Sequence, residues 1–474
     1  MFPITISLNE ASEKPLYRQL YEEIAEAINR GLLQSGEKLP SKRNLCRLLH
    51  VSHSTVENAY GLLKAEGYIE SIPKSGYVVA SLSLSPAAQE SSSVSKDIKS
   101  KTQEPSPQVK TDLFPIGAIA TEQFPYSSWA RIYREVIYQS PELLEKGDPQ
   151  GEYALRRELA AYLAEYRGTV CDPRQIVIGA GFEYLMERLL MVLRSLDRRD
   201  RPIALEDPGY PAAERIARAF QIPIEYIPVD KSGMKIEKLE NSTAGIVFVT
   251  PSHQFPTGAT MPLSRRTALL KWARENEAYV IEDDYDSDFR YQSRPIRSMQ
   301  GIDDASHVIY LGTFNRTIAP AVRVAYMILP EPVLEAYQTM FAKQAVTVSR
   351  FEQVALSKLM ASGIYARHIR RSSNLYKKRG EALKQALLKA LPECSITGDG
   401  AGLHFLLHLP DVSEKKLIQC AENEQMILHP MSAYQHHGSS RGCTLVIGFA
   451  GLSETRMEVS VNCLQNLIHK AKLI

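Results

Sequence analysis

The sequence predicts an N-terminal winged helix-turn-helix domain, a flexible linker, and a large α/β domain that continues into a C-terminal α+β small domain. Three observations support this division. Residues 1–80 are dense in helical and turn signals, residues 81–111 contain almost no bulky apolar side chain, and short β-rich runs alternate with amphipathic stretches from residue 112 onward. A chain of 474 residues is also too long for one compact core, which favours several domains.

The composition is that of an ordinary soluble globular protein, with 44% hydrophobic and 23% charged residues. No run of about 18 apolar residues predicts a membrane span, and Met1–Leu8 is too short for a signal peptide. The six cysteines form no CxxC pair, so we expect reduced thiols, no metal site and a cytoplasmic location. The net charge is only +2, so binding to nucleic acid must depend on local charge placement.

Residues 1–80 combine helical periodicity with a hairpin signal. Apolar residues recur at helical spacing in a first helix that ends at Gly31: Leu16, Leu20, Ile24, Ala27 and Ile28. Ser41 is a suitable N-cap for a second, short helix, and Ser52 opens a third. Tyr68–Glu70 and Gly76–Val79 flank a polar turn, which predicts a β-hairpin. This order of elements is the layout of a winged helix-turn-helix.

The charges of this first domain are balanced in number but not in position. It contains nine Lys/Arg and nine Asp/Glu, yet no acid lies between Glu37 and Glu57. That stretch contains four cations: Lys38, Lys42, Arg43 and Arg47. They surround the start of the third helix, where Ser52–Thr55 are short enough to reach phosphates or base edges. Charge alone is equally consistent with a compact helical domain that has a basic surface; the order of elements favours DNA binding.

Residues 15–79 closely resemble the GntR-type winged helix domain. The shared motifs are the PLY start, the LPSxR segment, the VSxxTVxxAY recognition helix and the EGY entry to the wing. The resemblance, together with the basic patch, predicts contacts with double-stranded promoter DNA from Lys42, Arg43, Ser52, His53, Ser54, Thr55, Lys74 and Gly76. The family usually has arginine where His53 stands, and imidazole cannot bind guanine through two parallel hydrogen bonds. The base preference of the family is therefore not transferable.

The following segment, residues 81–111, is rich in Ser, Lys, Gln and Pro and predicts a flexible linker. As a coil of about 30 residues, its ends would lie roughly 30 Å apart.

From residue 112 to 474 the pattern is that of an α/β domain. Amphipathic helical stretches separate six β-rich runs: Gln175–Ile178, Arg201–Leu205, Gly245–Val249, Tyr279–Ile281, His307–Leu311 and Arg323–Leu329. This alternation predicts a mostly parallel sheet with helices on both faces. From about residue 345, long helices precede the strand candidates Gly402–His408 and Thr444–Phe449, which predicts the smaller α+β domain.

Five motifs in this domain resemble the fold-type-I enzymes that use pyridoxal 5'-phosphate (PLP). They are Gly147–Gly151 with Leu155-Arg156, Gly179–Gly181, Glu206–Tyr210, Thr250–Gly258 and Ile281–Asp286. Each is weak alone, but their order behind a GntR-type domain resembles the MocR/GabR family of transcription regulators. In that family a fold-type-I aminotransferase-like domain serves as the effector sensor.

The resemblance implies roles for individual residues. Gly181 would cradle a phosphate at a helix N-terminus, and Tyr210 would stack on the pyridine ring. Asp283 would hold the pyridine nitrogen protonated, with Tyr285 near the ring hydroxyl. Thr313 and Arg323 would complete the cofactor-binding set, Arg323 at the position that binds phosphate or carboxylate.

One departure from the family is large. The Schiff-base lysine of the family follows a Thr-Phe-Ser segment, which here reads Thr313-Phe314-Asn315, and Arg316 stands at the lysine position. A guanidinium stays protonated and has no nucleophilic amine. No lysine occurs between Lys271 and Lys343. Phe182-Glu183 also replaces the usual small hydroxyl residue and glutamine beside the phosphate turn. We therefore predict no catalytic residue.

These departures leave several interpretations open. PLP binds noncovalently, with Arg316 added to the predicted cofactor-binding residues, or the pocket takes another anionic ligand. Deliberate replacement of the lysine is a further possibility, but it would not explain Phe182-Glu183 or Asn315. Arg316 could instead have a structural role, bridging Asp283 or another acid.

The predicted function is a DNA-binding transcription regulator whose aminotransferase-like domain senses PLP, a PLP–amino acid adduct or another anionic metabolite. The alternatives are a PLP-dependent aminotransferase, which the loss of the lysine disfavours, and a domain that serves only for dimerisation. Because fold-type-I proteins generally build their pocket at a dimer interface, we also expect a homodimer.

Overall fold

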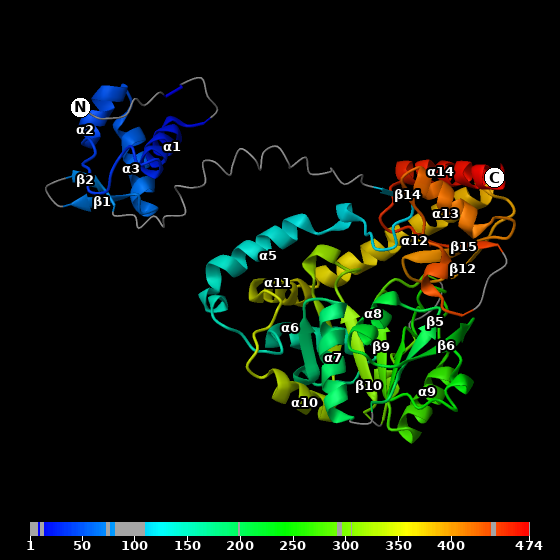
Figure 1. Ribbon diagram of the computed structural model, residues 1–474. Coiled ribbons are helices and arrows are strands. Elements are labelled where there is room, and N and C mark those ends of the chain that lie inside the picture. Colours follow the sequence, from blue (N-terminus) through cyan, green and yellow to red (C-terminus); the bar gives the residue numbers. More distant parts are fainter. Residues whose placement is uncertain are drawn as a thin grey trace. The chain divides into compact units, whose positions relative to one another are not determined.

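The structure is a computed structural model that describes residues 8–9, 14–72, 76–80, 110–197, 200–291, 296–304, 306–437 and 442–473. The chain divides into two compact units, Met1–Pro107 and Gln108–Ile474, called here the front unit and the larger unit (Figure 1). Of the linker predicted over 81–111, residues 81–109 lie outside the described residues.

The front unit consists of helices and a hairpin, as predicted. Its elements are α1 (Leu16–Asn29), α2 (Lys42–Leu49), α3 (His53–Ala65), β1 (Ile69–Ile72) and β2 (Gly76–Val79). One cluster of buried apolar side chains joins the three helices to the hairpin, and Leu20, Leu45, Val56 and Tyr60 have no exposed surface within it. The helical spacing seen in the sequence is therefore the stripe that faces this core.

Serine caps begin the two short helices. Ser41 Oγ accepts a hydrogen bond from the backbone N–H of Asn44 at 3.3 Å, and Ser52 Oγ accepts one from that of Thr55 at 3.1 Å. Each cap of this kind stabilises a helix by about 1 kcal/mol. Between the two helices His50 adopts a left-handed backbone with φ 54° and ends α2. The caps and this turn fix the start of α3 relative to α2.

The hairpin forms the wing. β1 and β2 pair antiparallel, with Ile69 opposite Val79 and Ile72 opposite Gly76. An additional antiparallel bridge joins Lys38 to Val78, so the segment before α2 lies beside the wing.

The larger unit is built on an eight-stranded sheet of order β4-β11-β10-β9-β8-β5-β6-β7. Six strands run parallel, and β11 and β7 run antiparallel to their neighbours. The strands are β4 (Ile176–Gly179), β5 (Ile203–Asp207), β6 (Ile224–Asp230), β7 (Gly233–Met234), β8 (Ile246–Val249), β9 (Tyr279–Asp284), β10 (Val308–Thr313) and β11 (Ala325–Ile328). The sequence predicted all of these strands except β6 and the edge strand β7. β6 was missed because its positions are mostly half-buried, so it lacks the apolar run of a central strand.

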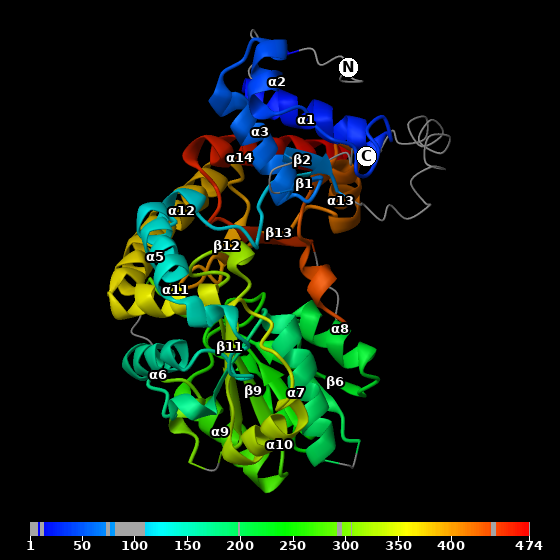
Figure 2. The same cartoon turned by 90° about the vertical axis from the view of Figure 1, so that its left-hand side faces the viewer.

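Helices cover both faces of the sheet, as predicted (Figure 2). One face is covered by α7 (Phe182–Leu196), α8 (Pro211–Ala219) and α10 (Glu331–Phe341). The other is covered by α6 (Tyr153–Arg167), α9 (Leu263–Glu275) and α11 (Arg350–Ala361), with α5 (Tyr126–Gln139) packed on α11. Among the described residues, no helix is both long and apolar enough to span a bilayer.

The C-terminal part forms the predicted α+β subdomain. Its antiparallel sheet has the order β12 (Ser395–Thr397), β13 (His404–Leu409), β15 (Cys443–Gly448). The core of this subdomain is completed by α13 (Glu414–Asn423), α14 (Glu454–Leu473) and the second half of α12 (Ile364–Ala390). β14 (Met426–Ile427) pairs in parallel with β3 (Thr111–Asp112). Thr111, which the sequence placed in the linker, is therefore part of a strand in the larger unit.

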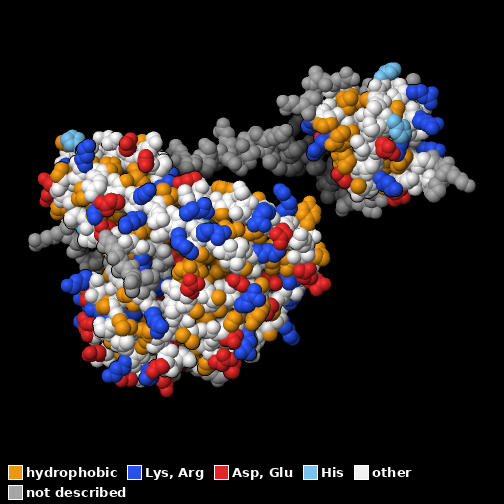
Figure 3. All heavy atoms as spheres, turned by 180° about the vertical axis from the view of Figure 1, so that it is seen from behind, with side chains coloured by type: hydrophobic (Ala, Val, Ile, Leu, Met, Phe, Trp, Pro, Cys, Tyr) orange, Lys and Arg blue, Asp and Glu red, His pale blue; other side chains and the backbone are white. Residues whose placement is uncertain are grey.

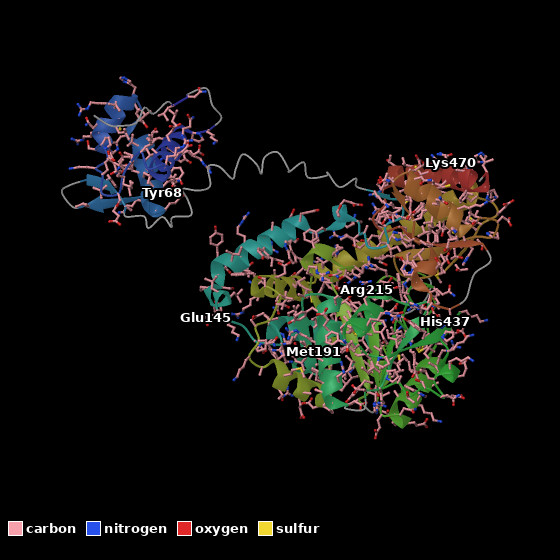
Figure 4. All side chains as sticks on the ribbon, viewed as in Figure 1. Tyr68, Glu145, Met191, Arg215, His437 and Lys470 are labelled. Atoms are coloured by element: carbon pink, nitrogen blue, oxygen red, sulfur yellow. The ribbon has the colours of Figure 1, made fainter. Side chains whose placement is uncertain are left out.

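A loop of this subdomain, residues 429–437, is fastened to the end of β5, and we call it the latch. The backbone N–H groups of His436 and His437 donate to Asp207 Oδ1 at 2.8 Å and Oδ2 at 2.9 Å. The backbone N–H of Gly209 donates to Tyr434 O at 2.9 Å. Figure 4 labels His437 at this junction. The His437 side chain is exposed, but its Nδ1 also lies 2.9 Å from Asp207 Oδ2.

Candidate functional site

The N-terminal tip of α3 presents short polar side chains. Ser52, His53 and Ser54 are exposed, and Thr55 is half-buried. The Ser52 hydroxyl lies 2.8 Å from the hydroxyls of both Ser54 and Thr55, in addition to capping the helix. Small hydroxyl side chains thus surround the first backbone N–H groups of α3, an arrangement that favours a phosphate oxygen.

One acid enters the basic patch, which the sequence did not predict. Glu57 Oε1 lies 2.6 Å from Lys42 Nζ, and Glu57 Oε2 lies 3.7 Å from His53 Nδ1. The hydrogen bond to Glu57 raises the pKa of Lys42, and the same bond lowers the pKa of Glu57. Only the packing of α2 against α3 brings Lys42 and Glu57 together. Lys42 must therefore exchange Glu57 for phosphate if it is to contact DNA.

Three other cations near the tip are exposed and have no acidic partner among the described residues: Lys38, Arg43 and Arg47. Gly76 is exposed at the start of β2 with φ +102°, and a Cβ there would lie 3.8 Å from Lys38 Cε. The wing and the patch are thus continuous at Lys38. Lys74, the predicted wing-tip contact, lies outside the described residues.

The larger unit contains a cavity of about 240 Å³ beyond the carboxyl ends of its central strands, where α/β sheets bind ligands. Six of the predicted cofactor-binding residues line it: Tyr210, Asp283, Tyr285, Thr313, Arg316 and Arg323. The remaining one, Gly181, is the N-cap of α7. The other lining residues are Gly117, Phe182, Glu183, Thr250, Phe255, Asn315 and Pro320. The fold thus brings together residues from motifs far apart in the sequence.

Aromatic rings form one wall of the cavity. Phe182 and Tyr210 meet edge-to-face with 5.3 Å between ring centroids, and Tyr210 and Phe255 do so at 5.6 Å. Tyr210 is the N-cap of α8, and Arg215, labelled in Figure 4, lies on that helix. Burial raises the pKa of Tyr210, and the charges of Arg316 and Arg215 oppose this rise. Such a wall suits a flat aromatic ligand.

The three consecutive acids at the end of β9 have different surroundings. Successive side chains of a strand point to opposite faces, so Asp283 points away from Glu282 and Asp284. Asp284 is bound by Arg167, with 2.6 Å between Oδ2 and Nε, and Glu282 accepts a hydrogen bond from the backbone N–H of Met299 at 2.9 Å. Of the three, Asp283 alone lines the cavity.

The Asp283 carboxyl is buried and accepts no hydrogen bond from the described residues. Burial raises its pKa well above the usual range; the nearby Asp284, Asp286 and Glu206 add to the rise, and Arg316 opposes it. Burial therefore favours the neutral carboxyl when the cavity holds no cation. A ligand with a positively charged N–H group would favour its ionised form.

Tyr285 is held by a buried cluster at the cavity. Its hydroxyl donates to the carbonyl oxygen of His253 at 3.0 Å and lies 3.2 Å from His253 Nδ1. His253 Nδ1 is also 2.9 Å from Asp286 Oδ2, and the His404 ring centroid is 4.9 Å from that of His253. The sequence predicted no metal site, yet the potential ligand atoms of His253, Asp286 and His404 lie within 4.8 Å of one another. Of these three residues, His253 is the one that is hydrogen-bonded to Tyr285.

Arg316 lines the cavity without pairing with an acid. Its Nη1 donates to the carbonyl oxygen of Ile116 at 2.9 Å. Among the described residues it forms no ion pair with Asp283 or any other acid, so the bridging role considered from the sequence is absent. A cation that faces the cavity without a carboxylate partner is suited to an anionic ligand.

Arg323 lies over the start of α7, close to Gly181. A Cβ at Gly181 would lie 2.6 Å from Arg323 Nη2, and Gly181 has φ +100°, so this approach requires glycine. Arg323 Nη2 donates to Ala180 O at 3.3 Å and lies 3.4 Å from Glu183 Oε2. Glu183, which stands where the family usually has a glutamine, lines the cavity and pairs with Arg323. Both side chains are about half exposed, at 53% and 44%, so the pair is weak enough to open.

Several lining residues were not assigned to the pocket from the sequence. Thr250 and Phe255 lie inside the Thr250–Gly258 motif, and Asn315 lies beside Arg316, so a signal for them was available. Gly117 lies well before the first motif and carries no signal. It reaches the cavity because the chain entering the larger unit passes beside Arg316, and a Cβ at Gly117 would lie 3.7 Å from Arg316 Nη1.

Glu206 lies behind the aromatic wall. Its Oε2 accepts hydrogen bonds from the backbone N–H of Thr250 at 3.1 Å, from its hydroxyl at 2.8 Å and from Gln254 at 3.2 Å. Its Oε1 is buried without a hydrogen-bond partner. Burial raises the pKa of Glu206 to about 7, although Thr250 and Gln254 oppose the rise.

We expect Glu206→Gln to remove a pH dependence of stability. Between the ordinary pKa of 4.5 and about 7, the folded chain retains a proton that the unfolded chain has lost, so Glu206 lowers stability as pH rises through this window. The unfolding free energy of the variant minus that of the parent should therefore increase by about 2–3 kcal/mol from about pH 4.5 to pH 8. Denaturation at both pH values measures this. If the difference in unfolding free energy between variant and parent is the same at both pH values, the raised pKa of Glu206 is contradicted.

Comparison with known proteins gives two family matches. Residues 16–79 match the family described as bacterial regulatory proteins, gntR family, and residues 116–463 match aminotransferase class I and II. The chain is 39% identical to the helix-turn-helix-type transcriptional regulator YdeL of Bacillus subtilis, over 98% of each chain. It is 32% identical, over 95% of each chain, to the pyridoxine biosynthesis transcriptional regulator PdxR of Corynebacterium glutamicum.

Among solved structures, the fold resembles that of a kynurenine aminotransferase from Pyrococcus horikoshii. The TM-score is 0.68 at 26% identity, and the match covers 82% of this chain and 97% of the enzyme.

Proposed function

The chain belongs to the MocR-type transcriptional regulators, in which a GntR-family helix-turn-helix domain precedes an aminotransferase class I and II domain, and from this premise we propose that a ligand in the cavity of the larger unit controls DNA binding by the front unit. The observation that carries the proposal is the cavity itself. Its lining includes an acid, Asp283, and aromatic rings of the kind that a PLP site would use, and it includes no lysine among the described residues. A domain that can bind a ligand but lacks the nucleophile of an aminotransferase is suited to act as a ligand sensor.

DNA contact is assigned to the tip of α3 and to the wing. Arg43 and the exposed side chains of His53 and Ser54 would reach the major groove, since α3 holds the position of the recognition helix. Lys74 and Gly76 of the wing would contact a neighbouring stretch of backbone. GntR-family domains bind double-stranded DNA, and the capped start of α3 offers N–H groups to phosphate.

The residues present fit PLP held noncovalently. The buried Asp283 carboxyl, with no internal hydrogen bond, would pair with the pyridine N–H, and Tyr210 would pack on the ring. Arg316 would face an anionic group, and Arg323 would do so after releasing Glu183. In enzymes PLP supplies an electron-withdrawing ring and a reactive aldehyde. None of the described residues that line the cavity is a lysine, and Arg316 has no nucleophilic amine to attack that aldehyde.

The runner-up ligand is a different flat anion, which Arg316 and the aromatic wall would also accept. Aminotransferase activity is disfavoured because the guanidinium of Arg316 replaces the amine such an enzyme requires. A homodimer is the proposed assembly. It is supported by large apolar side chains exposed on and after α5, with Tyr138 81% and Leu144 80% exposed, and light scattering on the purified chain tests it.

The proposal is tested by DNA binding with and without PLP. A duplex selected by the full chain from a random-sequence library serves as the probe, and fluorescence anisotropy measures affinity. We expect PLP to change the dissociation constant for this duplex by about 5-fold to 150-fold. A duplex bound no better than random DNA would refute the regulator, and an affinity that PLP leaves unchanged would point to a different effector.

Asp283→Asn is the matched control, because the amide imitates the neutral carboxyl but cannot become an anion. The variant should bind the duplex as the parent does when no PLP is present. Its affinity for PLP, measured by equilibrium dialysis, should fall by about 10-fold to 100-fold, the loss of a charge-assisted hydrogen bond. Unchanged PLP affinity would place the cofactor elsewhere.

A further inference from the structure

Helix α12 carries a row of cations on its solvent face. The row comprises five exposed side chains: Arg367, Arg370, Arg371, Lys377 and Lys378. No acid occurs in the sequence between Gly363 and Glu381. We call this set the α12 stripe.

The helical period places the α12 stripe on the face of the helix opposite the core. The buried residues of the same stretch, Tyr365, His368, Ile369, Ser372 and Tyr376, recur at intervals of three and four and form the inner face. The cations occupy the remaining positions, so all five project on the opposite side. They form one continuous face rather than scattered charges.

The stripe is not neutralised within the described part of the chain. None of its five side chains forms an ion pair with a described acid, and the one hydrogen bond among them runs from Arg367 Nη2 to Ser362 O at 3.4 Å. Neighbouring cations of α12 behave differently: Arg379 pairs with Glu122 and Lys384 with Asp399. Positive charge gathered without internal partners is suited to an external polyanion.

The surface around the α12 stripe is consistent with binding of a polyanion. Figure 3 shows Lys and Arg side chains gathered on one face of the larger unit.

We propose that the α12 stripe binds the phosphate backbone of the same DNA duplex that the front unit holds. This rests on the proposed function, because the front unit must bring the duplex. From Arg367 to Lys378 the helix rises about 16 Å, at about 1.5 Å per residue. That length matches about five phosphates of one strand, spaced about 3.4 Å along the axis. The contact reads no sequence, since it involves only the backbone.

The covalent connection permits both contacts. The stretch 81–109 between the described parts of the two units can span at most about 100 Å when fully extended, at about 3.3–3.6 Å per residue. A duplex bound by the front unit is therefore present at high effective concentration near the larger unit. The tethered duplex is therefore favoured over other polyanions, which would have to be captured from solution.

The test compares a four-fold charge variant with a matched control. The stripe variant carries Arg370→Gln, Arg371→Gln, Lys377→Gln and Lys378→Gln. The control carries Lys231→Gln, Lys238→Gln, Lys415→Gln and Lys416→Gln, which removes the same charge from exposed positions elsewhere in the larger unit. Affinities are measured as a function of salt on the selected site in a duplex of about 60 base pairs and on the site trimmed to about 20, roughly two helical turns.

On the long duplex, the stripe variant should lose affinity, and its slope of log K against log salt should be shallower by about one for each phosphate contact removed. The control should behave as the parent. On the short duplex all three proteins should bind alike, since that duplex offers no backbone beyond the site.

Equal slopes for the parent and the stripe variant on the long duplex would overturn the proposal. So would a change of equal size in the control, because it would reflect net charge only. Failure of the parent to prefer the selected site is a different result: it would refute the proposed regulator itself. Equal thermal unfolding of the three proteins verifies that the substitutions leave the fold intact.

Discussion

Replacing Arg167 by methionine is expected to lower the free energy of unfolding of the larger unit by about 3–5 kcal/mol. Arg167 and Asp284 are almost fully buried, with side chains 3% and 1% exposed. Arg167 Nε lies 2.6 Å from Asp284 Oδ2, and Arg167 Nη2 donates to the hydroxyl of Ser252 at 2.7 Å. Removing the guanidinium leaves a carboxylate without its counter-charge in the interior, which is the most unfavourable way to break such a pair.

The pKa of Asp284 defines how this loss varies with pH. Burial opposes ionisation of Asp284, but Arg167 and the hydrogen bonds from Tyr310 and Ser287 outweigh it and lower the pKa. In the parent, Asp284 therefore adds stability above its ordinary pKa, and this stability is lost as pH falls through the lowered value. Without Arg167 the carboxyl prefers its proton, so the deficit of the variant should shrink in acid.

Tryptophan fluorescence in urea measures the effect, because both tryptophans of the chain, Trp129 and Trp272, belong to the larger unit. The matched control is the double variant Arg167→Met with Asp284→Asn, which removes both charges. It should be more stable than the single variant, since no unpaired charge remains. If the free energy of unfolding of Arg167→Met lies within about 1 kcal/mol of that of the parent, Arg167 does not stabilise the buried Asp284 carboxylate as described.

Arg316→Lys is expected to allow covalent attachment of PLP in the cavity of the larger unit. A lysine amine can lose its proton when desolvated and attack an aldehyde carbon, whereas the guanidinium of Arg316 cannot. The side chain of residue 316 already lines the cavity that contains Asp283 and Tyr285. After incubation with PLP and reduction with borohydride, intact mass should therefore show one cofactor per chain in the variant.

The parent and Arg316→Met should both remain unlabelled after the same treatment and denaturation. Peptide mapping separates the expected label at position 316 from incidental labelling of surface lysines. If the lysine variant gains no label at that position, PLP does not occupy the cavity beside residue 316. One cofactor per chain on the parent, mapped to a single other lysine, would show that a different residue has taken over the attachment.

The sequence predicted the front unit almost entirely, because its helices carry clear apolar stripes and each short helix begins at a capping serine. Ser41, Ser52 and the buried Leu20 are visible as local patterns. The link from Glu57 to Lys42 was missed, since it joins two helices that only tertiary packing brings together.

In the larger unit, motif order predicted which residues share a cavity, and strand periodicity explains why Asp283 enters it while Asp284 does not. What the sequence could not provide were contacts across the fold. Gly117 approaches Arg316 from far along the chain, and Glu183 meets Arg323 from a different element. Such contacts depend on backbone geometry. The φ of +100° at Gly181 is an example, and the only sign of it in the sequence is the glycine itself.

The latch gives the small subdomain a mechanical connection to the wall of the cavity. Asp207, which holds the backbone of His436 and His437, is three residues before Tyr210, and Gly209 is bonded to Tyr434. Tyr434 also meets Phe255 edge-to-face, with 5.1 Å between ring centroids. A displacement of the aromatic wall must therefore either break these contacts or carry residues 429–437 with it. Through these contacts the position of the aromatic wall and the position of the small subdomain depend on each other.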